Sequence, residues 1–491
     1  MEREKKVPSA LMSLTPIVIM AILLLIGSGA LNKLIGIEIS LKSEPIIIIC
    51  AVFAGILAYY LGYSWNEMQG AIVEKISKAL PATLILWSVG FLIGGLMFSG
   101  SVPMIIYYGV QWINPQYIIV LAFLLSALLS VLTGTSWGAA GTIGVAMMGI
   151  AGGLDVSLPA TAGAVVSGAY FGDKLSPLSD TTNLAPIAAG SELREHIKHM
   201  LYTTIPASIF ACIIYLIIGL NADVSSYAAP EQMHNMTTQL DEMFNFNILL
   251  LLPLLIVVMG SVFKLPTIPI MLISSLLCIP IGIISHGFSV QDGFLSLVSG
   301  FNVEMTPLNA EPIFEVTRLI NRGGATSVTA TTVLVFCAMG FAGIMSVSGM
   351  LDTTLSIITK GVKTAGGVIF STIASCFTVA FVTGSSYLTI LIPGELFNDV
   401  YPKYNLHAKN LSRTLEDSGT VLVPLIPWSA AGAYMASALG VSTIEYLPWA
   451  ILNWSGIIIA IILGYTGIGI AKSDGSMLRC LIKKGDNNVS N

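Results

Sequence analysis

The chain has 491 residues, of which 55% are hydrophobic and only 10% are charged, and its mean hydropathy is +0.84. Soluble domains carry about 25% charged residues, so this composition excludes a soluble globular protein and predicts a chain that crosses a lipid bilayer repeatedly. The net charge of −5 says little for a membrane protein, and nothing in the sequence suggests a nucleic-acid partner. The six scattered cysteines predict neither a disulfide nor a structural metal.

Apolar segments follow one another along almost the whole chain. No small-residue cleavage pattern precedes the first, so we expect it to be a retained helix rather than a signal peptide. Several segments are shorter than the ~20 residues that a full crossing needs, which predicts half-helices or hairpin arms. The candidates are Leu11–Leu31, Pro45–Gly62, Pro81–Phe98, Tyr117–Leu132, Leu158–Tyr170, Thr203–Leu220, Phe246–Val262, Pro266–Ile284, Ala325–Ser346, Gly367–Val382, Val421–Leu439 and Pro448–Ile470.

Positive charges flank the apolar region at both ends, whereas the polar loop at 221–245 contains no lysine or arginine. Under the positive-inside rule, both termini are cytoplasmic and this loop is external. The charges concerned are Arg3, Lys5, Lys6, Lys472, Arg479, Lys483 and Lys484 outside the loop, and Asp223, Glu231, Asp241 and Glu242 within it. The predicted division is a first transmembrane repeat at 1–222, an external acidic linker at 223–245, a second repeat at 246–472 and a cytoplasmic tail at 473–491.

The two halves share short motifs, which indicates an internal repeat. The pairs are TGTSW at 133–137 with TGSSY at 383–387, Ser-Gly at 99–100 with Ser-Gly at 348–349, and Leu-Ser-Asp at 178–180 with Leu-Glu-Asp at 415–417. The first pair is separated by 250 residues (383 − 133) and the last by 237 (417 − 180), so the spacing slips between them.

The charge distribution predicts that the two halves are inverted, a plan in which broken helices meet near the bilayer midplane. Each half also has an amphipathic stretch, Trp65–Leu80 in the first and Val303–Asn321 in the second. These stretches are expected to lie along opposite membrane surfaces.

The stretch at 167–190, SGAYFGDKLSPLSDTTNLAPIAAG, places charged and hydroxyl side chains beside apolar segments. Gly172, Pro177 and Pro186 are expected to break the helix, and irregular backbone at membrane depth is tolerated only where it is buried in protein or lines water. A carboxylate there indicates a cavity, a partner or an ion. The candidate ion-binding residues are Asp173, Asp180, Thr181, Thr182 and Asn183, with Asp180 and Thr182 as sodium ligands.

The two TG-[TS]-S turns supply hydroxyl and carbonyl oxygens, which can replace part of the hydration shell of sodium. The alternative is a close-packed contact between small residues. GTSWG at 134–138 also fits the G-x-S-x-G nucleophile motif, but its surroundings are helical and no histidine lies in a neighbouring apolar run, so we treat the match as chance. The candidate ligands are Thr133, Thr135 and Ser136 in the first half and Ser385 and Ser386 in the second.

The matching polar stretch of the second half is NLSRTLEDSGTVLVPLIPWSAAG at 410–432, in which Pro424 and Pro427 break the following helix. Its candidate ion- or proton-binding residues are Glu416, Asp417, Ser418 and Thr420.

The cationic residues of the polar stretches, Lys174 and Arg413, have two interpretations. In the first, each of them can form an ion pair with Asp173, and Arg413 can instead pair with Glu416. In the second, they bind a carboxylate substrate.

Two histidines, His196 and His199, occur in the amphipathic stretch SELREHIKHM at 191–200. They can sense cytoplasmic pH, but a solvated surface face is the simpler expectation.

The chain resembles the NhaC family of sodium/proton antiporters through most of its length. The motifs that carry the resemblance are GAYFGDKLSPLSDTTNLAP, TGTSWG, LSRTLEDSGTVLVPLIPWSAAGAYMA, MFSGSVPMIIYYG and NRGGATS. The resemblance implies an inner-membrane exchanger of bacteria or archaea with paired re-entrant hairpins and broken helices. The family includes plain sodium/proton antiporters and proteins that couple sodium-lactate to proton-malate exchange.

We therefore predict an all-α polytopic membrane protein of two inverted-topology repeats, with re-entrant hairpins and broken transmembrane helices. Its predicted function is secondary active exchange of sodium for protons across the cytoplasmic membrane, with Asp180 or Asp417 carrying the proton that competes with sodium. The expected partners are sodium, the proton and the lipid bilayer. No cofactor beyond the transported ions is expected, and a homodimer is left open.

Two alternatives remain at this point. An organic-anion antiporter of the malate/lactate type, or an amino-acid exchanger, brings in a small carboxylate partner. An intramembrane aspartyl protease would use Asp180 and Asp417 as two buried carboxylates, but no motif supports it, and we expect no enzyme.

Overall fold

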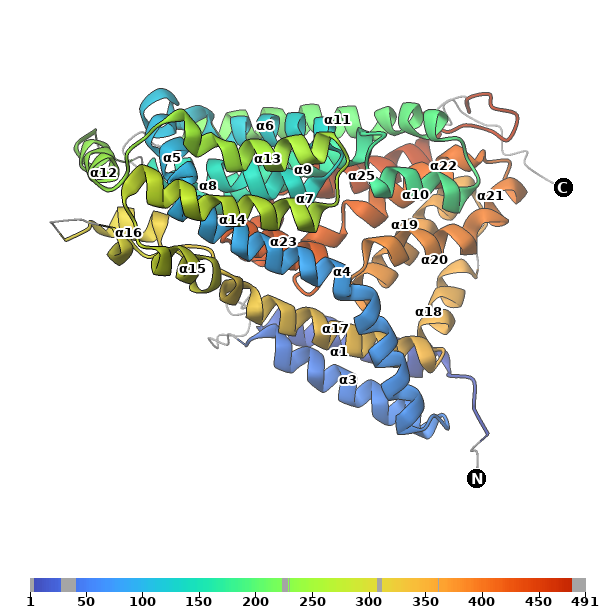
Figure 1. The fold of residues 1–491 in the computed structure, drawn as a ribbon. Coiled ribbons are helices and arrows are strands. Elements are labelled where there is room, and N and C mark those ends of the chain that lie inside the picture. The colour runs from blue at the N-terminus through green and yellow to red at the C-terminus, as the bar shows by residue number, and fades with distance from the viewer. Residues whose placement is uncertain are drawn as a thin grey trace.

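The computed structural model describes residues 4–27, 41–222, 228, 230–306, 311–360 and 362–478, and these fold almost entirely into helices (Figure 1). Several charges on which the predicted orientation rests, Arg3, Asp223, Arg479, Lys483 and Lys484, lie outside the described residues. The orientation of the termini and the division into repeats, linker and tail therefore stay predictions.

The first half of the chain runs from α1 to α11. Its helices are α1 (Ala10–Gly27), α3 (Ser43–Tyr60), α4 (Trp65–Phe98), α5 (Ser101–Trp112), α6 (Ile118–Thr133), α7 (Ser136–Ala139), a π-helical turn (Ala140–Gly144), α8 (Val145–Gly153), α9 (Leu158–Leu175), α10 (Asp180–Ala189) and α11 (Leu193–Asn221).

The second half runs from α12 to α25. Its helices are α12 (Pro230–Met243), α13 (Leu252–Val262), α14 (Thr267–His286), α15 (Val290–Ser299), α16 (Phe314–Ile320), α17 (Thr329–Val347), α18 (Met350–Thr359), α19 (Ala365–Thr383), α20 (Ser386–Asn398), α21 (Val400–Lys403), α22 (Ala408–Leu415), a π-helical turn (Glu416–Thr420), a 3₁₀ turn (Val423–Leu425), α23 (Ala430–Leu439), α24 (Thr443–Tyr446) and α25 (Ile451–Thr466).

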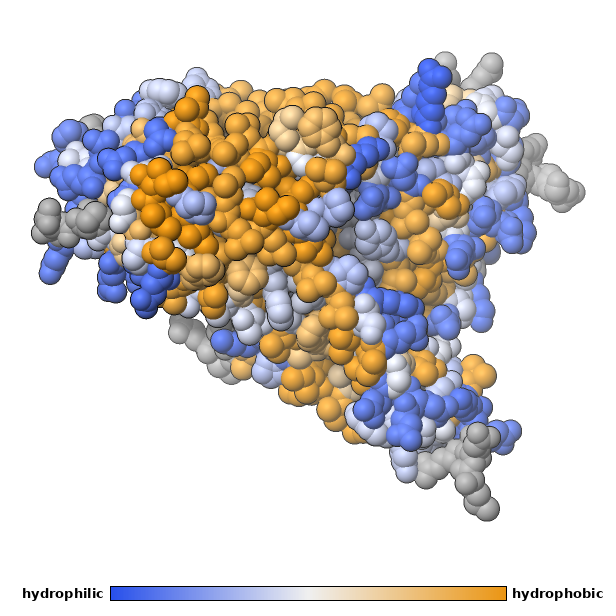
Figure 2. Space-filling view, in the orientation of Figure 1, coloured by the Kyte–Doolittle hydropathy of each residue, from blue (hydrophilic) through white to orange (hydrophobic). Residues whose placement is uncertain are grey.

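Apolar side chains cover much of the outer surface. The described residues include 8 helices long and apolar enough to cross a bilayer, and 3 further helix pairs bent by more than 40° at a short break. Figure 2 shows a broad hydrophobic band over α6, α13 and α14, between hydrophilic ends near α12 and near α10 and α21. On these helices Leu128, Leu255 and Ile273 are each more than half exposed. Such a surface suits lipid, so the predicted all-helical polytopic membrane protein is confirmed.

Element boundaries in the two halves repeat at a constant separation of 250 residues around the polar stretches. α6 ends at Thr133 and α19 at Thr383, α9 begins at Leu158 and α22 at Ala408, and α10 and α23 span 180–189 and 430–439. Left-handed glycines end the matching helices, Gly134 and Gly384 with φ of 70° and 58°, and Gly190 and Gly440 with φ of 69° and 70°. The internal repeat is thus visible in the backbone.

This constant register corrects one predicted alignment. The pairing of Leu-Ser-Asp at 178–180 with Leu-Glu-Asp at 415–417 is wrong, because at a separation of 250 Asp180 corresponds to Ala430 and Asp417 to Ser167. Helix caps fix the register instead, since the Ser179 and Ser429 side chains accept hydrogen bonds from the third residue of α10 and of α23.

The expected surface stretches are also corrected. Trp65–Leu80 is not a separate helix but continues through Pro81 into the single 34-residue helix α4, whose first turn has a complete capping box at Ser64 and Glu67. The second stretch, Val303–Asn321, is interrupted, since helix covers only Val303–Met305 and Phe314–Ile320 in its described residues.

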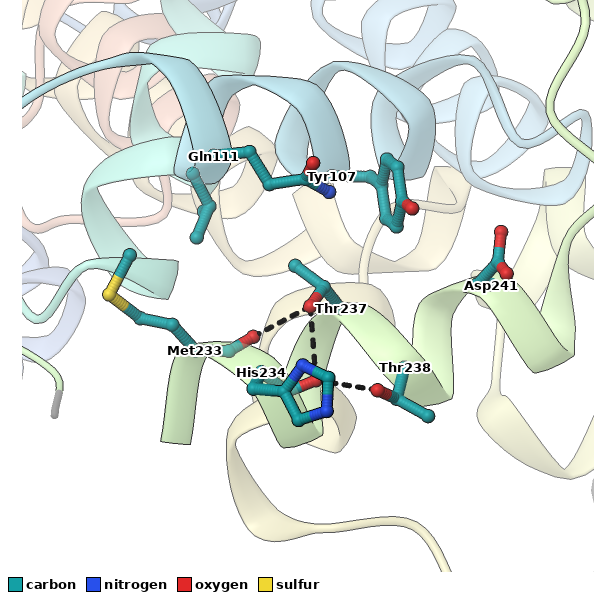
Figure 3. A pocket seen from close by; sticks show the side chains of 8 residues that line it. Tyr107, Gln111, Met233, His234, Thr237, Thr238 and Asp241 are labelled. Atoms are coloured by element: carbon teal, nitrogen blue, oxygen red, sulfur yellow. Dashed lines mark hydrogen bonds between the residues drawn. The ribbon is translucent and has the colours of Figure 1, made fainter. Parts of the chain in front are cut away.

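The segment predicted as a linker contains a helix. α12 packs against α5 and α16, and a pocket of about 420 Å³ lies between α5 and α12 (Figure 3). In this pocket Thr237 and Thr238 donate their hydroxyl hydrogens to carbonyls of α12 itself, as the dashed lines in Figure 3 show. The hydroxyls therefore stabilise the helix rather than point at a common centre.

Candidate functional site

The first half contributes Asp173 and Lys174 from the C-terminal part of α9. α9 packs closely on α6, because Gly168 and Gly172 lie against the α6 backbone with no room for a side chain. Gly172 therefore does not break the helix as predicted, and the break lies at residues 176–179 instead. Ser136 Oγ donates a hydrogen bond of 2.7 Å to Asp173 Oδ2.

Lys174 and Asp417 form a buried ion pair between the two halves. Lys174 Nζ lies 2.6 Å from Asp417 Oδ1, and the two side chains are 1% and 0% exposed. Thr203 Oγ1 on α11 donates to the same oxygen at 2.9 Å. The expected ion pair of Lys174 with Asp173 is therefore wrong, because Lys174 instead reaches across to the second half.

Arg413 lies on the other side of the same carboxylate. Its Nε is 3.9 Å from Asp417 Oδ2, and its Nη1 donates to the Gly469 carbonyl oxygen at 2.7 Å. The predicted pair of Arg413 with Glu416 is wrong, because the chain is helical here and the residue four positions on, Asp417, comes nearest. One carboxylate therefore faces two buried cations.

Glu416 completes the cluster. Thr181 Oγ1 on α10 donates to Glu416 Oε1 at 3.1 Å, so the first half also holds this carboxylate. Three buried oxygens, Glu416 Oε2, Asp417 Oδ2 and Thr420 Oγ1, have no hydrogen-bond partner among the described residues. Residues 416–420 form a π-helical turn, a local irregularity common at functional positions.

The buried charges of this cluster do not cancel. Asp173, Glu416 and Asp417 are three carboxylates, and Lys174 and Arg413 are two cations. With every group ionised the cluster carries one excess negative charge. An uncompensated buried charge is costly, so a cluster of this composition favours one additional monovalent cation or one proton.

Asp180 differs from these three acids because it is exposed. It occupies the first position of α10, a favourable place for a negative charge at a helix N-terminus, and Tyr387 Oη donates to its Oδ2 at 3.4 Å. The expectation that Asp180 is buried is therefore wrong, and its role as a sodium ligand stays a prediction.

The other candidates around α10 use their polar groups locally. Thr182 Oγ1 donates to the Asp173 carbonyl oxygen at 2.6 Å, and Asn183 Nδ2 donates to the Ser179 carbonyl oxygen at 2.6 Å. These bonds fix the turn between α9 and α10, which holds the Asp173 backbone in place.

Among the TG-[TS]-S turn residues, only Ser136 has a recorded contact with a carboxylate in the described structure. Thr133 donates to the Leu129 carbonyl oxygen at 2.8 Å, and Thr135 accepts from the Gly138 amide at 3.2 Å. In the second half, Ser385 caps α20 and Ser386 is its first residue. Ser418 donates to the Thr414 carbonyl oxygen at 2.6 Å within its own helix.

A role for Thr203 was not predicted from the sequence, and a solvated face was expected for two histidines. His196 and His199 are instead buried, with His196 Nδ1 3.0 Å from Ser412 Oγ and His199 Nε2 3.0 Å from Asn410 Oδ1. The surface prediction failed because α22 covers the polar face of α11. The only available signal was the periodic spacing of polar residues along this stretch. Such spacing marks a polar helix face but does not show whether water or another polar helix covers it.

Membrane-crossing helices, two broken helices and an acid-rich cluster between them define a polytopic membrane protein with the plan of a transporter. The family model of the Na+/H+ antiporter family matches residues 168–468, more than half of the chain. The chain is 48% identical over 467 residues to an uncharacterized Na+/H+ antiporter of Haemophilus influenzae, covering 95% of this chain and 98% of that protein.

Two further relatives have more specific names. Identity is 40% over 439 residues to the Na+/H+ antiporter NhaC of Alkalihalophilus pseudofirmus, covering 88% of this chain and 92% of that protein. It is 36% over 419 residues to the malate-2H+/Na+-lactate antiporter of Bacillus subtilis, covering 84% and 87%. The chain therefore belongs to the Na+/H+ antiporter family, as its resemblance predicted.

Proposed function

We propose that the chain exchanges sodium ions for protons across a bacterial or archaeal cytoplasmic membrane, with both termini on the cytoplasmic side. The observation that carries this proposal is the charge balance of the buried cluster, in which three carboxylates face two cations. One monovalent cation neutralises the cluster, and either sodium or a proton can supply that charge. Because only one of them is needed at a time, binding of one favours release of the other.

Asp173 and Glu416 are the carboxylates that take the exchanged ion. Each is held by a hydroxyl, Ser136 or Thr181, rather than by a cation, so its charge is not already neutralised by contact. The free oxygens of Glu416 and Thr420 add hard ligands of the kind that sodium takes. The ion pair of Lys174 with Asp417 instead joins the two halves.

The residues at the break between α9 and α10 have supporting roles in this scheme. Asp180, exposed at the start of α10, attracts sodium toward the cluster, and Thr182 holds the Asp173 backbone. Protonation of Asp173 or Glu416 neutralises the cluster when no sodium is bound. The protein can then change the side of the membrane to which the site is open without carrying an uncompensated charge.

Proton flux in proteoliposomes tests the proposal. Purified protein is reconstituted with an internal pH dye, and sodium, lithium or potassium is added with and without malate and lactate. Sodium alone is expected to drive proton movement. If sodium alone moves no protons in protein shown to be folded, the proposal fails.

Organic-anion exchange is the second candidate, because the chain is 36% identical to a malate-2H+/Na+-lactate antiporter. Against it stands the geometry of the two cations first considered as carboxylate ligands, since Lys174 and Arg413 both face Asp417. Flux that appears only when malate or lactate is present would favour this candidate.

A further inference from the structure

A second charged position lies outside the ion cluster, in the loop NRGGATS at 321–327. Arg322 lies two residues beyond the end of α16, a helix at the end of the molecule that carries α12 and α15 (Figure 1). The loop is fixed on α4, because Gly324 N donates to the Gly90 carbonyl oxygen at 2.8 Å and a Cβ at Gly94 would lie 3.0 Å from Gly324 N. The backbone that carries Arg322 is therefore held firmly.

The Arg322 guanidinium has no acidic partner in the described part of the chain. Its Nη2 donates to the Leu439 carbonyl oxygen at 3.0 Å, and no carboxylate forms an ion pair with it. Burial and then the like charge of Arg318 lower the pKa of Arg322. The carbonyl oxygen of Leu439 accepts one of five guanidinium N–H groups, so donors remain for another acceptor.

A cavity of about 370 Å³ adjoins this guanidinium. Its walls include the apolar side chains of Ile93 and Val441, and Thr331 and Ser437 line it as a hydroxyl pair 2.9 Å apart. Only one hydroxyl hydrogen is used between Thr331 and Ser437, so the other can reach a ligand. The volume is near the lower end of the ~300–1,000 Å³ that small-molecule sites occupy.

The rim of the cavity limits the charge of a ligand. Ser442 lines the cavity, and its hydroxyl donates to Glu445 Oε2 at 2.7 Å, which brings a carboxylate close to the opening. A second negative charge on a ligand would be repelled there. One guanidinium fork, one hydroxyl donor and apolar walls match a short monocarboxylate.

We propose that the cavity beside Arg322 binds a small monocarboxylate of the size of acetate or lactate. The carboxylate lies on the free edge of the guanidinium, and the short aliphatic part contacts Ile93 and Val441. This binding position shares no residue with the ion cluster and does not depend on sodium/proton exchange. The competing explanation is that Arg322 only caps α23, whose last carbonyl it contacts.

Calorimetric titration of the purified full chain distinguishes these explanations. The probes are sodium acetate, sodium lactate, sodium malate and sodium chloride, at constant sodium concentration and ionic strength. Acetate and lactate are expected to bind, malate more weakly and chloride not detectably. Arg322→Gln is expected to weaken lactate binding about tenfold or more. Arg194→Gln, which changes an exposed arginine outside the cavity lining, is the matched control and should bind as the unaltered chain does.

A double variant, Thr331→Val with Ser437→Ala, covers the case in which Arg322→Gln fails to fold. It removes the hydroxyl donor and keeps the contact of Arg322 with Leu439, so lactate affinity should fall about threefold or more. The proposal is overturned if the unaltered chain binds neither acetate nor lactate, if chloride binds equally well, or if the folded variants keep full affinity. Sodium-driven proton flux in chloride should be the same in all these variants, which separates this test from that of the exchange function.

Discussion

The broken helices α9–α10 and α22–α23 share one backbone plan but carry different charges. Both begin at matching positions, both break before a serine-capped ten-residue helix, and both end at a left-handed glycine. The acids and bases do not match, because Lys174 corresponds to Pro424 and Asp417 to Ser167. Caps and glycines therefore define the repeat, whereas the ion cluster depends on the departure from it.

The asymmetry leaves one ion pair between the halves. A strictly repeated sequence would also carry a lysine at position 424 and an aspartate at position 167, where this chain has Pro424 and Ser167. Lys174 from the first broken helix meets Asp417 from the second at 2.6 Å, and Ser167 instead accepts a hydrogen bond from Tyr215 Oη at 2.7 Å.

The largest effect is expected from Asp417→Asn, which leaves Lys174 and Arg413 buried without a carboxylate. Breaking a buried ion pair by removing one partner costs about 3–5 kcal/mol. The measurement is the apparent free energy of unfolding in mild detergent. The double variant Lys174→Met with Asp417→Leu should recover part of the loss, because only Arg413 then lacks its carboxylate, and Ser167→Ala is the control at the equivalent position. An Asp417→Asn protein as stable as the unaltered chain would contradict the buried pair.

Asp173→Asn and Glu416→Gln should remove transport without unfolding the protein. Each amide oxygen still accepts the hydrogen bond from Ser136 or Thr181, but the excess negative charge is lost. Sodium-driven proton flux should fall about 100-fold or more, since neither ion is then needed to neutralise the cluster. Asp180→Asn is the control, with an expected loss of about threefold, because a surface charge only attracts the ion. Equal losses of flux at all three positions would contradict separate roles for the buried cluster and the exposed Asp180.

Ser136 and Ser386 are equivalent in the repeat, so they form a matched pair. Ser136 donates to Asp173, whereas Ser386 begins α20 and has no recorded carboxylate contact in the described structure. Ser136→Ala should raise the half-saturating sodium concentration about tenfold, the effect of one hydrogen bond to a charged group. Ser386→Ala should leave it within about twofold. The measurement is proton flux over a series of sodium concentrations. A larger effect of Ser386→Ala than of Ser136→Ala would contradict the asymmetric cluster.

The smallest difference between the halves is expected at the TG turns. Gly134→Ala and Gly384→Ala both force a side chain into left-handed backbone, which costs about 1–2 kcal/mol. Gly134→Ala should be the more destabilising, because its Cβ would lie 2.5 Å from Leu178 Cβ, whereas the nearest atom at Gly384 is 3.0 Å away. Melting temperatures check this order. If only one variant lowers stability, the turns are not equivalent.

The parts of the fold that local chemistry determines could be predicted from the sequence. Low charge content gives the membrane class, and Thr-Gly followed by a hydroxyl residue marks a helix end and a new cap in both halves. Ser136 of the first turn contacts Asp173, a partner that was not specified, and its role as an ion ligand stays a prediction.

The remaining parts depend on packing between distant segments. Gly172 was interpreted as a helix breaker, but it serves the contact of α9 with α6, which a single sequence does not show. The buried histidines were missed for the same reason, because α22 covers them. Asp180 was aligned with Asp417 because the residues around them are similar. The register of the two halves is instead set by helix caps that carry no charge.

Proton release on sodium binding tests the central claim most directly. Purified protein in weakly buffered detergent solution is titrated with sodium chloride, with potassium chloride as control, while a pH dye reports the protons released. The account predicts a sodium-specific release that approaches one proton per chain in an acidic starting solution and disappears in Asp173→Asn and in Glu416→Gln. Sodium binding without proton release, or release that persists in both variants, would contradict the view that the two ions compete for one buried negative charge.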